Sequence, residues 1–210
     1  MAEPLVVTGG SLLDAKSEQQ ADLLIADGKI ADIGDPGAFN GKGLEVDASD
    51  ALVMPGFVDI QVHFRTPGGE ESEDISSGAA GAALGGVTAC LMMPNTVPTI
   101  DNPDLVSEVL RLGRDTPCDV YTSAAITVDR AGESLVDFVA LYEAGVRVFT
   151  DDGTVVDSED LMRGALEASS QFPDVVISQH AEHSAMVEGG VINQGVVSDR
   201  LGLKGRPSEA

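Results

Sequence analysis

Short apolar runs separated by turn residues dominate the first fifty positions. Runs at 5–8, 23–26, 29–33 and 44–46 are bounded by Gly, Asp or Pro. The Asp27-Gly28 pair between LLIA and KIADI is typical of a two-residue hairpin turn. Residues 1–54 are therefore predicted to form a small β-sandwich module with antiparallel pairing.

A second rhythm follows Met54-Pro55-Gly56, where strand-like apolar runs alternate with helix-like segments. Strands are expected at 57–64, 87–93, 119–126, 146–150 and 174–180. Helices are expected at about 74–85, 102–113, 133–144, 158–171 and 182–189. Alternation with a repeat of roughly 25 to 32 residues predicts a parallel sheet.

Such a sheet is either open and doubly wound or closed into a barrel. No G-x-G-x-x-G follows the first strand and no G-x-x-x-x-G-K occurs, so the glycine loops of nucleotide-binding open sheets are absent from the sequence. The barrel is favoured, but residues 55–210 supply only five strands and a sixth near Gly205, whereas a complete barrel needs about 250 residues. The predicted fold is α/β, an incomplete TIM-type (β/α) barrel after the β-sandwich module.

Polar residues gather where these strands are expected to end, the edge at which barrel enzymes carry their catalytic groups. All three histidines lie there, with several neighbours that can bind a metal or a substrate. The set is Asp59, Gln61, His63, Arg65, Asn95, Asp151, Asp152, His180, Glu182 and His183. Imidazole and carboxylate ligands around an open position suit a zinc ion that activates water.

The first strand concentrates this chemistry. Asp59, Gln61, His63 and Arg65 alternate along it, so all four are expected on one face of the sheet. Buried together, they would require mutual pairing or a metal ion. The sequence therefore predicts a metal or catalytic site at this end of the sheet.

Charge excludes several classes of partner. The chain has 12 Lys and Arg against 35 Asp and Glu, a net charge of −23, which disfavours nucleic acids and anionic membrane surfaces. No apolar stretch is long enough to span a membrane and no secretory signal is evident, so a cytoplasmic location is expected. Cys90 and Cys118 form no metal or disulfide pattern and are expected to be buried thiols.

One long segment is distinctive. Positions 55–102, PGFVDIQVHFRTPGGEESEDISSGAAGAALGGVTACLMMPNTVPTIDN, resemble the first two barrel strands of the dihydroorotases, a family of cyclic amidohydrolases. The resemblance continues through FTDDG at 149–153, QHAEH at 179–183 and the run 188–210, and it includes the N-terminal module. HFRTPG followed by MPNT is closer to dihydroorotases than to allantoinases or dihydropyrimidinases.

The resemblance implies one or two Zn²⁺ ions. His63 and His180 match metal-binding histidines, and the DDG motif supplies a carboxylate ligand, assigned to Asp152 with Asp151 as the alternative. The first histidine of the family's His-x-His pair is replaced by Gln61, whose neutral amide is a weaker zinc ligand than imidazole.

Substrate contacts follow from the same resemblance. Arg65 and Asn95 match the pair that binds the substrate carboxylate, for which a guanidinium fork is well suited. His183 stands where the family has an acidic residue and receives no role. The family's strand-six histidine and its catalytic aspartate are expected beyond residue 210, so no catalytic residue is assigned within the chain, which is expected to be the N-terminal part of a longer protein.

The implied activity is the zinc-dependent, reversible cyclisation of N-carbamoyl-L-aspartate to dihydroorotate in pyrimidine biosynthesis. Two alternatives remain. Gln61 is consistent with an inactive paralogue kept as a structural partner, for example of aspartate transcarbamoylase, and the fold is also that of enzymes acting on hydantoin or allantoin. A homo-oligomer is a further possibility, because five barrel strands alone would leave open edges and exposed apolar side chains.

Overall fold

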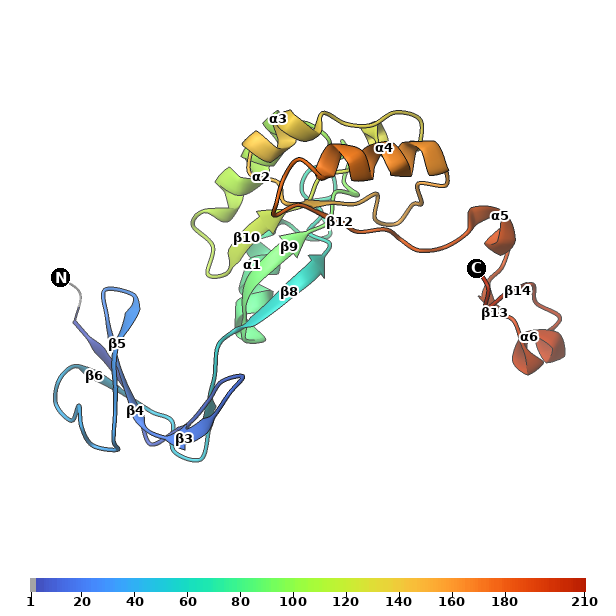
Figure 1. Ribbon diagram of the computed structural model, residues 1–210. Coiled ribbons are helices and arrows are strands. Elements are labelled where there is room, and N and C mark those ends of the chain that lie inside the picture. Colours follow the sequence, from blue (N-terminus) through green and yellow to red (C-terminus); the bar gives the residue numbers. More distant parts are fainter. Residues whose placement is uncertain (1–2) are drawn as a thin grey trace. The chain divides into compact units, whose positions relative to one another are not determined.

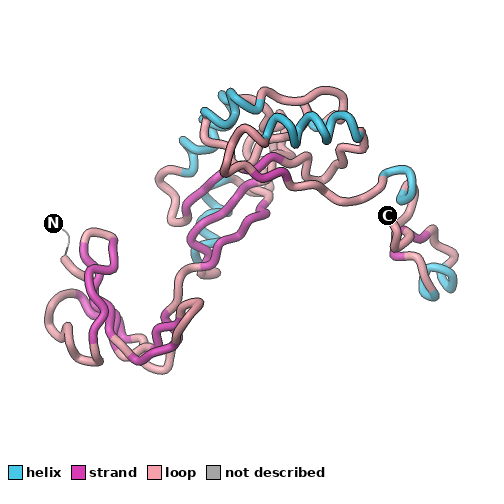
Figure 2. The backbone as a smooth tube through the Cα atoms, in the orientation of Figure 1, coloured by secondary structure: helices cyan, strands magenta, loops and turns pink. Residues whose placement is uncertain are grey.

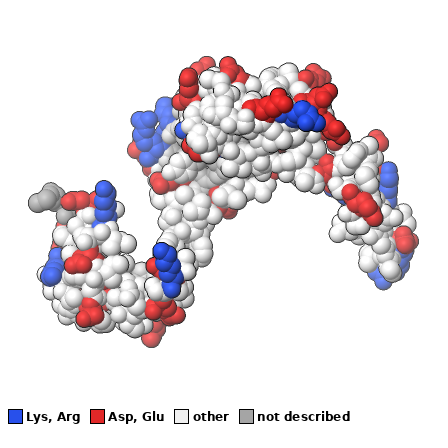
Figure 3. All heavy atoms as spheres, in the orientation of Figure 1, with Lys and Arg blue, Asp and Glu red and all other residues white. Residues whose placement is uncertain are grey.

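A computed structural model describes residues 3–210 of the chain (Figure 1). The chain divides into two compact units, Met1–Gly56 and Phe57–Ala210. Within the described residues, no helix combines the length and apolarity needed to cross a membrane. Acidic side chains are scattered over the visible face of both units rather than gathered in one patch (Figure 3).

Two small sheets build the first unit (Figure 2). One has the order β5-β4-β1-β6 and the other the order β3-β2-β7. Their strands are β1 (Leu5–Thr8), β2 (Ser11–Leu13), β3 (Glu18–Gln20), β4 (Asp22–Ala26), β5 (Lys29–Gly34), β6 (Leu44–Asp47) and β7 (Leu52–Val53). Strands β2, β3 and β7 were not predicted, since they are only two or three residues long.

The predicted hairpin is confirmed. Strands β4 and β5 pair antiparallel, and the turn between them places Asp27 and Gly28 at φ values of 50° and 74°. Positive φ at both central positions is the geometry that matches the twist of a hairpin. The expectation of purely antiparallel pairing is wrong, because β6 runs parallel to β1 and β7 parallel to β2.

The second unit contains parallel strands in the order of the sequence. Strands β8 (Phe57–Val62), β9 (Val87–Met92) and β10 (Asp119–Thr122) form one sheet, and β11 (Val148–Phe149) pairs with β12 (Val176–Ile177). A parallel bridge between Ala124 and Phe149 joins the two groups. The five predicted strands are therefore present, each shorter than expected, and neighbours in sequence are neighbours in space.

Helices α1 (Ile75–Leu84), α2 (Pro103–Gly113), α3 (Phe138–Glu143) and α4 (Glu159–Ser169) connect these strands. Each begins after a capping side chain that accepts a backbone N–H, namely Asp74, Asn102, Asp137 and Ser158. The helix expected from residue 133 starts only at Phe138, because Leu135 and Val136 pair with the chain after β10.

The core of the second unit lies between its helices and one face of the strands. Cys90, Met92 and Phe149 on the strands pack with Val109 of α2 and Leu141 of α3, all at most 1% exposed. The helices α2, α3 and α4 lie on the same side of the sheet (Figure 1). This side is the outer layer of a βα arrangement, and it fixes the ends of the strands that carry the polar residues.

The other face of the sheet is open. Val58, Ile60, Tyr121 and Val176 project apolar side chains that are 65%, 71%, 56% and 56% exposed. Among residues 3–210, no strand pairs with the outer edge of β8 or of β12, and the barrel is not closed.

The last described segment contains α5 (Ser184–Val187), β13 (Ile192–Asn193), α6 (Val196–Leu201) and β14 (Gly205–Arg206). The strand expected near Gly205 exists, but it pairs with β13 and not with β12, so it is not a sixth strand of the sheet. The helix expected at 182–189 is only one turn, because Glu188 leaves the helical region and two glycines follow.

Candidate functional site

Four of the sequence-predicted residues meet where β8, β9 and β11 end. Nε2 of Gln61 donates to Oδ1 of Asp152 at 2.8 Å. Nδ1 of His63 lies 3.1 Å from Oδ1 of Asn95, and its Nε2 lies 3.6 Å from Oδ2 of Asp152. Residues 91 positions apart in sequence therefore share one cluster, which we call the strand-end cluster: Gln61, His63, Asn95 and Asp152.

A β-bulge in β8 aims Gln61 into this cluster. Asp59 lies opposite Cys90 and Val62 opposite Met92, so three residue steps on β8 match two on β9. Cys90 and Met92 both face the helices, hence Asp59 lies on that side as well. The expectation that positions 59, 61, 63 and 65 share one face is wrong, because the bulge interrupts the alternation and redirects the side chains after it.

The two aspartates of FTDDG have different surroundings. Asp151 is buried, and its carboxylate accepts the backbone N–H of Ile126 at 2.7 Å, that of Thr127 at 3.1 Å and the Thr127 hydroxyl. The Asp151 carboxylate therefore uses its lone pairs to hold the segment that follows β10. The Asp152 carboxylate instead points into the strand-end cluster, where Oδ1 accepts from Gln61 and Oδ2 lies near Nε2 of His63.

His180 belongs to the same region. It lines a cavity of about 520 Å³ together with Gln61 and Asp152, at the open face of the sheet. Arg65 is exposed, and no hydrogen bond or ion pair joins its side chain to another residue in the 3–210 range. His183 precedes α5, and only its backbone is engaged, donating to the carbonyl of Ala210.

Arg130 lies beside the strand-end cluster, and the sequence analysis did not single it out. It lies in the short 3₁₀ segment η1 (Val128–Arg130) after β10, and its Nη2 comes within 4 Å of the Cβ position that Gly153 lacks. The signal in the sequence was weak: an arginine in a loop that follows a barrel strand, in a stretch assigned to neither strand nor helix.

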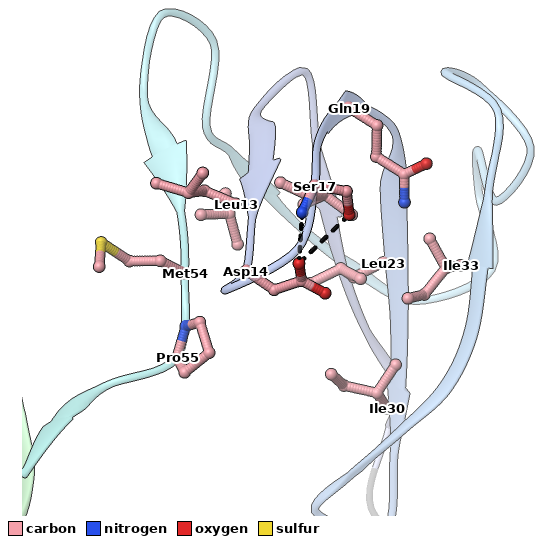
Figure 4. Close-up of a pocket in the computed structure, with 11 residues that line it drawn as sticks. Leu13, Asp14, Ser17, Gln19, Leu23, Ile30, Ile33, Met54 and Pro55 are labelled. Carbon is pink, nitrogen blue, oxygen red and sulfur yellow. Dashed lines mark hydrogen bonds between the residues drawn. The ribbon is translucent and has the colours of Figure 1, made fainter.

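A second cavity, of about 320 Å³, lies in the first unit (Figure 4). Its lining is mainly apolar, with Leu23, Ile30 and Ile33 from β4 and β5. Asp14 is its only titratable lining residue, and hydrogen bonds from the backbone N–H of Lys16 and Ser17 lower the pKa of that carboxyl. This cavity lacks the paired groups that acid–base or metal chemistry needs.

The strand-end cluster contains part of a metal site. If Oδ1 of Asn95 accepts from Nδ1 of His63, Nε2 presents its lone pair toward the Asp152 carboxylate. Two ligands of a tetrahedral zinc are about 3.4 Å apart, close to the 3.6 Å found here. However, no group of three His, Cys, Asp or Glu side chains in residues 3–210 has the geometry to hold a metal, so these residues do not form a complete zinc site.

Comparison with known proteins identifies the family. The family model described as dihydro-orotase-like matches residues 50–210, more than half of the chain. A dihydroorotase of Pelotomaculum thermopropionicum is 42% identical over 98% of this chain, and one of Aquifex aeolicus is 41% identical over the same share. The chain belongs to the dihydroorotase-like family. It spans about half the length of these relatives, 48% and 49%.

Solved structures agree on the fold. An L-hydantoinase (dihydropyrimidinase) from Arthrobacter aurescens superposes with a TM-score of 0.75 over 89% of this chain and 42% of its own. A D-hydantoinase superposes with a TM-score of 0.72 over 88% of this chain and 41% of its own. Both are 22% identical to this family member, so the similarity concerns the α/β architecture alone.

Proposed function

We propose that this chain is the first part of a dihydroorotase, which cyclises N-carbamoyl-L-aspartate to dihydroorotate and reverses that reaction. The observation that carries the proposal is the strand-end cluster, in which His63 and Asp152 meet beside Asn95. The dihydroorotases of about 40% identity along nearly the whole chain support it.

The five strands are, in this proposal, the first five of a TIM-type (β/α) barrel, residues 55–210, and residues 1–54 are a β-sandwich module. The sequential strand order without a reversal supports a barrel over a doubly wound sheet. The exposed side chains of Ile60 and Val176 would face the barrel interior. The remaining strands would come from the half of the relatives' length that this chain does not cover.

Within the site, His63, Asp152 and His180 are proposed as metal ligands, and Arg65 and Asn95 as substrate-binding residues. Asn95 also positions the histidine, because its carbonyl holds Nδ1 of His63 and fixes the ring orientation. The catalytic aspartate and a further histidine are expected beyond residue 210.

Zinc remains a prediction, with one or two ions. His63 and Asp152 have the chemical type and the spacing of zinc ligands. Gln61, in contrast, directs an amide N–H at the Asp152 carboxylate. We therefore derive no reaction step through a metal. The residues of this chain orient the substrate carboxylate and hold the Asp152 carboxylate at the open end of the sheet.

The alternatives are not favoured. The curated relatives named above are dihydroorotases, and hydantoinases resemble the chain only in fold. Association with aspartate transcarbamoylase, a homo-oligomeric state and a cytoplasmic location stay predictions. Within the strand-end cluster, Gln61 is the one residue that separates the two readings, because it would be expected in an inactive paralogue and not in an enzyme.

Turnover tests the proposal directly. The chain, alone and joined to the corresponding second half of the Aquifex aeolicus relative, is assayed for ring opening of dihydroorotate, with hydantoin as the competing substrate. Activity of the joined protein on dihydroorotate, lost in Asp152→Ala, supports the assignment. Preference for hydantoin, or activity that survives Asp152→Ala, contradicts it.

A further inference from the structure

The turn that carries Arg130 is held in an unfavourable conformation. Asp129 and Arg130 are consecutive non-glycine residues at φ values of 53° and 56°, a region that L-residues adopt at a cost. Two carboxylates brace the turn. Asp151 accepts from the backbone and hydroxyl of Thr127, and Oδ2 of Asp101 accepts from the backbone N–H of Asp129 at 2.9 Å.

This geometry brings the guanidinium beside the strand-end cluster. A methyl group on the Cα of Gly153 would lie 3.8 Å from Nη2 of Arg130 and 3.6 Å from Nδ2 of Asn95. The side-chain carbonyl of Asn95 is already paired with His63. The Nδ2 group of Asn95 is therefore the part of the amide that can bind a ligand. Two N–H donors thus approach one point above the glycine of FTDDG.

The charge of Arg130 is not neutralised within the described residues. Its Nε is buried without a hydrogen-bond partner, and none of the ion pairs formed by residues 3–210 includes it. No ion pair to Arg130 forms within residues 3–210, although the chain has 35 acidic residues. A half-buried guanidinium whose Nε has no hydrogen-bond partner can pair with an anion supplied by a ligand.

We propose that Arg130 binds the substrate carboxylate together with Asn95, as a group additional to Arg65. The inference rests on the proposed function and extends its substrate-binding set. It also explains the position of Asp151, which holds the turn that presents Arg130, while Asp152 beside it faces the metal-binding histidine. Planar bidentate pairing with a carboxylate favours arginine over lysine at this position.

Equilibrium binding tests the inference without requiring turnover. N-carbamoyl-L-aspartate is titrated by calorimetry into the 210-residue chain and into Arg130→Gln, Arg130→Lys and Arg114→Gln. Arg114, an exposed residue at the C-terminal end of α2, is the matched control for the loss of one charge. Dihydrouracil, which has the ring of dihydroorotate without its carboxylate, is the control ligand.

Arg130→Gln is expected to weaken binding of N-carbamoyl-L-aspartate by about tenfold or more, as is typical for a hydrogen bond to a charged group. The affinity of Arg130→Lys for N-carbamoyl-L-aspartate should lie between that of Arg130→Gln and that of the unchanged chain. The affinity of Arg114→Gln should equal that of the unchanged chain. Dihydrouracil should bind all four proteins equally. The inference is overturned if Arg130→Gln binds the dicarboxylate as well as the unchanged chain does, if it loses both ligands in parallel, or if the unchanged chain binds no N-carbamoyl-L-aspartate.

Turnover of dihydroorotate by the joined protein is measured separately. Arg130-dependent binding without any turnover would reject the proposed function and leave the carboxylate site in place. Turnover with binding that is indifferent to Arg130 would reject the carboxylate site and leave the proposed function in place.

Discussion

Nε2 of Gln61 donates a hydrogen bond of 2.8 Å to Oδ1 of Asp152. The bond joins the end of β8 to the loop after β11 and uses a lone pair of the carboxylate that also faces His63. An imidazole at position 61 could present a lone pair to the same point, whereas the amide N–H presents a proton. We therefore expect the residue at position 61 to affect how strongly the strand-end cluster binds a cation.

Gln61→His is expected to raise zinc affinity by at least about tenfold, because it restores an imidazole ligand beside His63. The measurement is zinc content per chain after equilibration with a buffered zinc solution, followed by competition with a chelator. Gln61→Leu is the control, since it breaks the bond to Asp152 without adding a ligand. An equal zinc content in all three proteins would contradict the proposed ligand set.

Asp151→Ala and Asp152→Ala are expected to differ in stability. Removal of the Asp151 carboxylate leaves two buried N–H groups and a hydroxyl without an acceptor, which should lower the free energy of unfolding by about 3 kcal/mol or more. Asp152→Ala loses only the contacts with Gln61 and His63 and should cost about 1 kcal/mol. Urea unfolding measures both, and equal losses would show that Asp151 does not have the structural role described.

Asp129→Gly is expected to stabilise the second unit. Asp129 has a φ of 53°, and glycine adopts this conformation without the steric cost that a Cβ carries. After the greater chain entropy of glycine is subtracted, the gain should be about 0.5 to 1 kcal/mol. Asp104→Gly, within the right-handed helix α2, is the control and should destabilise. A loss of stability in Asp129→Gly would indicate that the Asp129 side chain makes a necessary contact.

The Cys90 thiol should make stability decrease at high pH. Burial, then the hydrogen bond between the two thiols of Cys90 and Cys118, raises the pKa of Cys90 from 9.0 to about 12. The folded state therefore holds this proton while the unfolded state releases it. The resulting stabilisation is complete below pH 9 and is lost as the pH rises toward 12, with a slope of at most about 1.4 kcal/mol per pH unit. Urea unfolding between about pH 8 and 11 should show a steeper decrease than in Cys90→Ala, and identical slopes would contradict the assignment.

The open face of the sheet should drive self-association of the 210-residue chain. Ile60 is 71% exposed on an edge strand, and such edges pair readily with other chains. Ile60→Lys is expected to shift the chain toward monomer in sedimentation velocity. Val139→Lys, on the exposed surface of α3, should leave the association unchanged. A monomeric unmodified chain would contradict this prediction.

Local features of the chain were determined by the sequence alone. The Asp27-Gly28 hairpin follows from two residues that accept positive φ, and the βα alternation follows from apolar runs and capping residues. The resemblance to dihydroorotases also came from the sequence, because its motifs are contiguous. The family comparison confirmed it.

Tertiary structure decided the roles of particular side chains. The bulge between Asp59 and Val62 depends on pairing with β9, so the alternation of the isolated strand could not reveal where Gln61 points. Asp151 and Asp152 are adjacent and chemically identical, and only the folded chain after β10 distinguishes them by supplying three donors to the first. Arg130 reaches Gly153, far along the sequence, for the same reason. Hydrogen bonds between segments that are distant in sequence cannot be read from the local pattern of residues. These bonds determine which polar side chains remain available to bind a ligand.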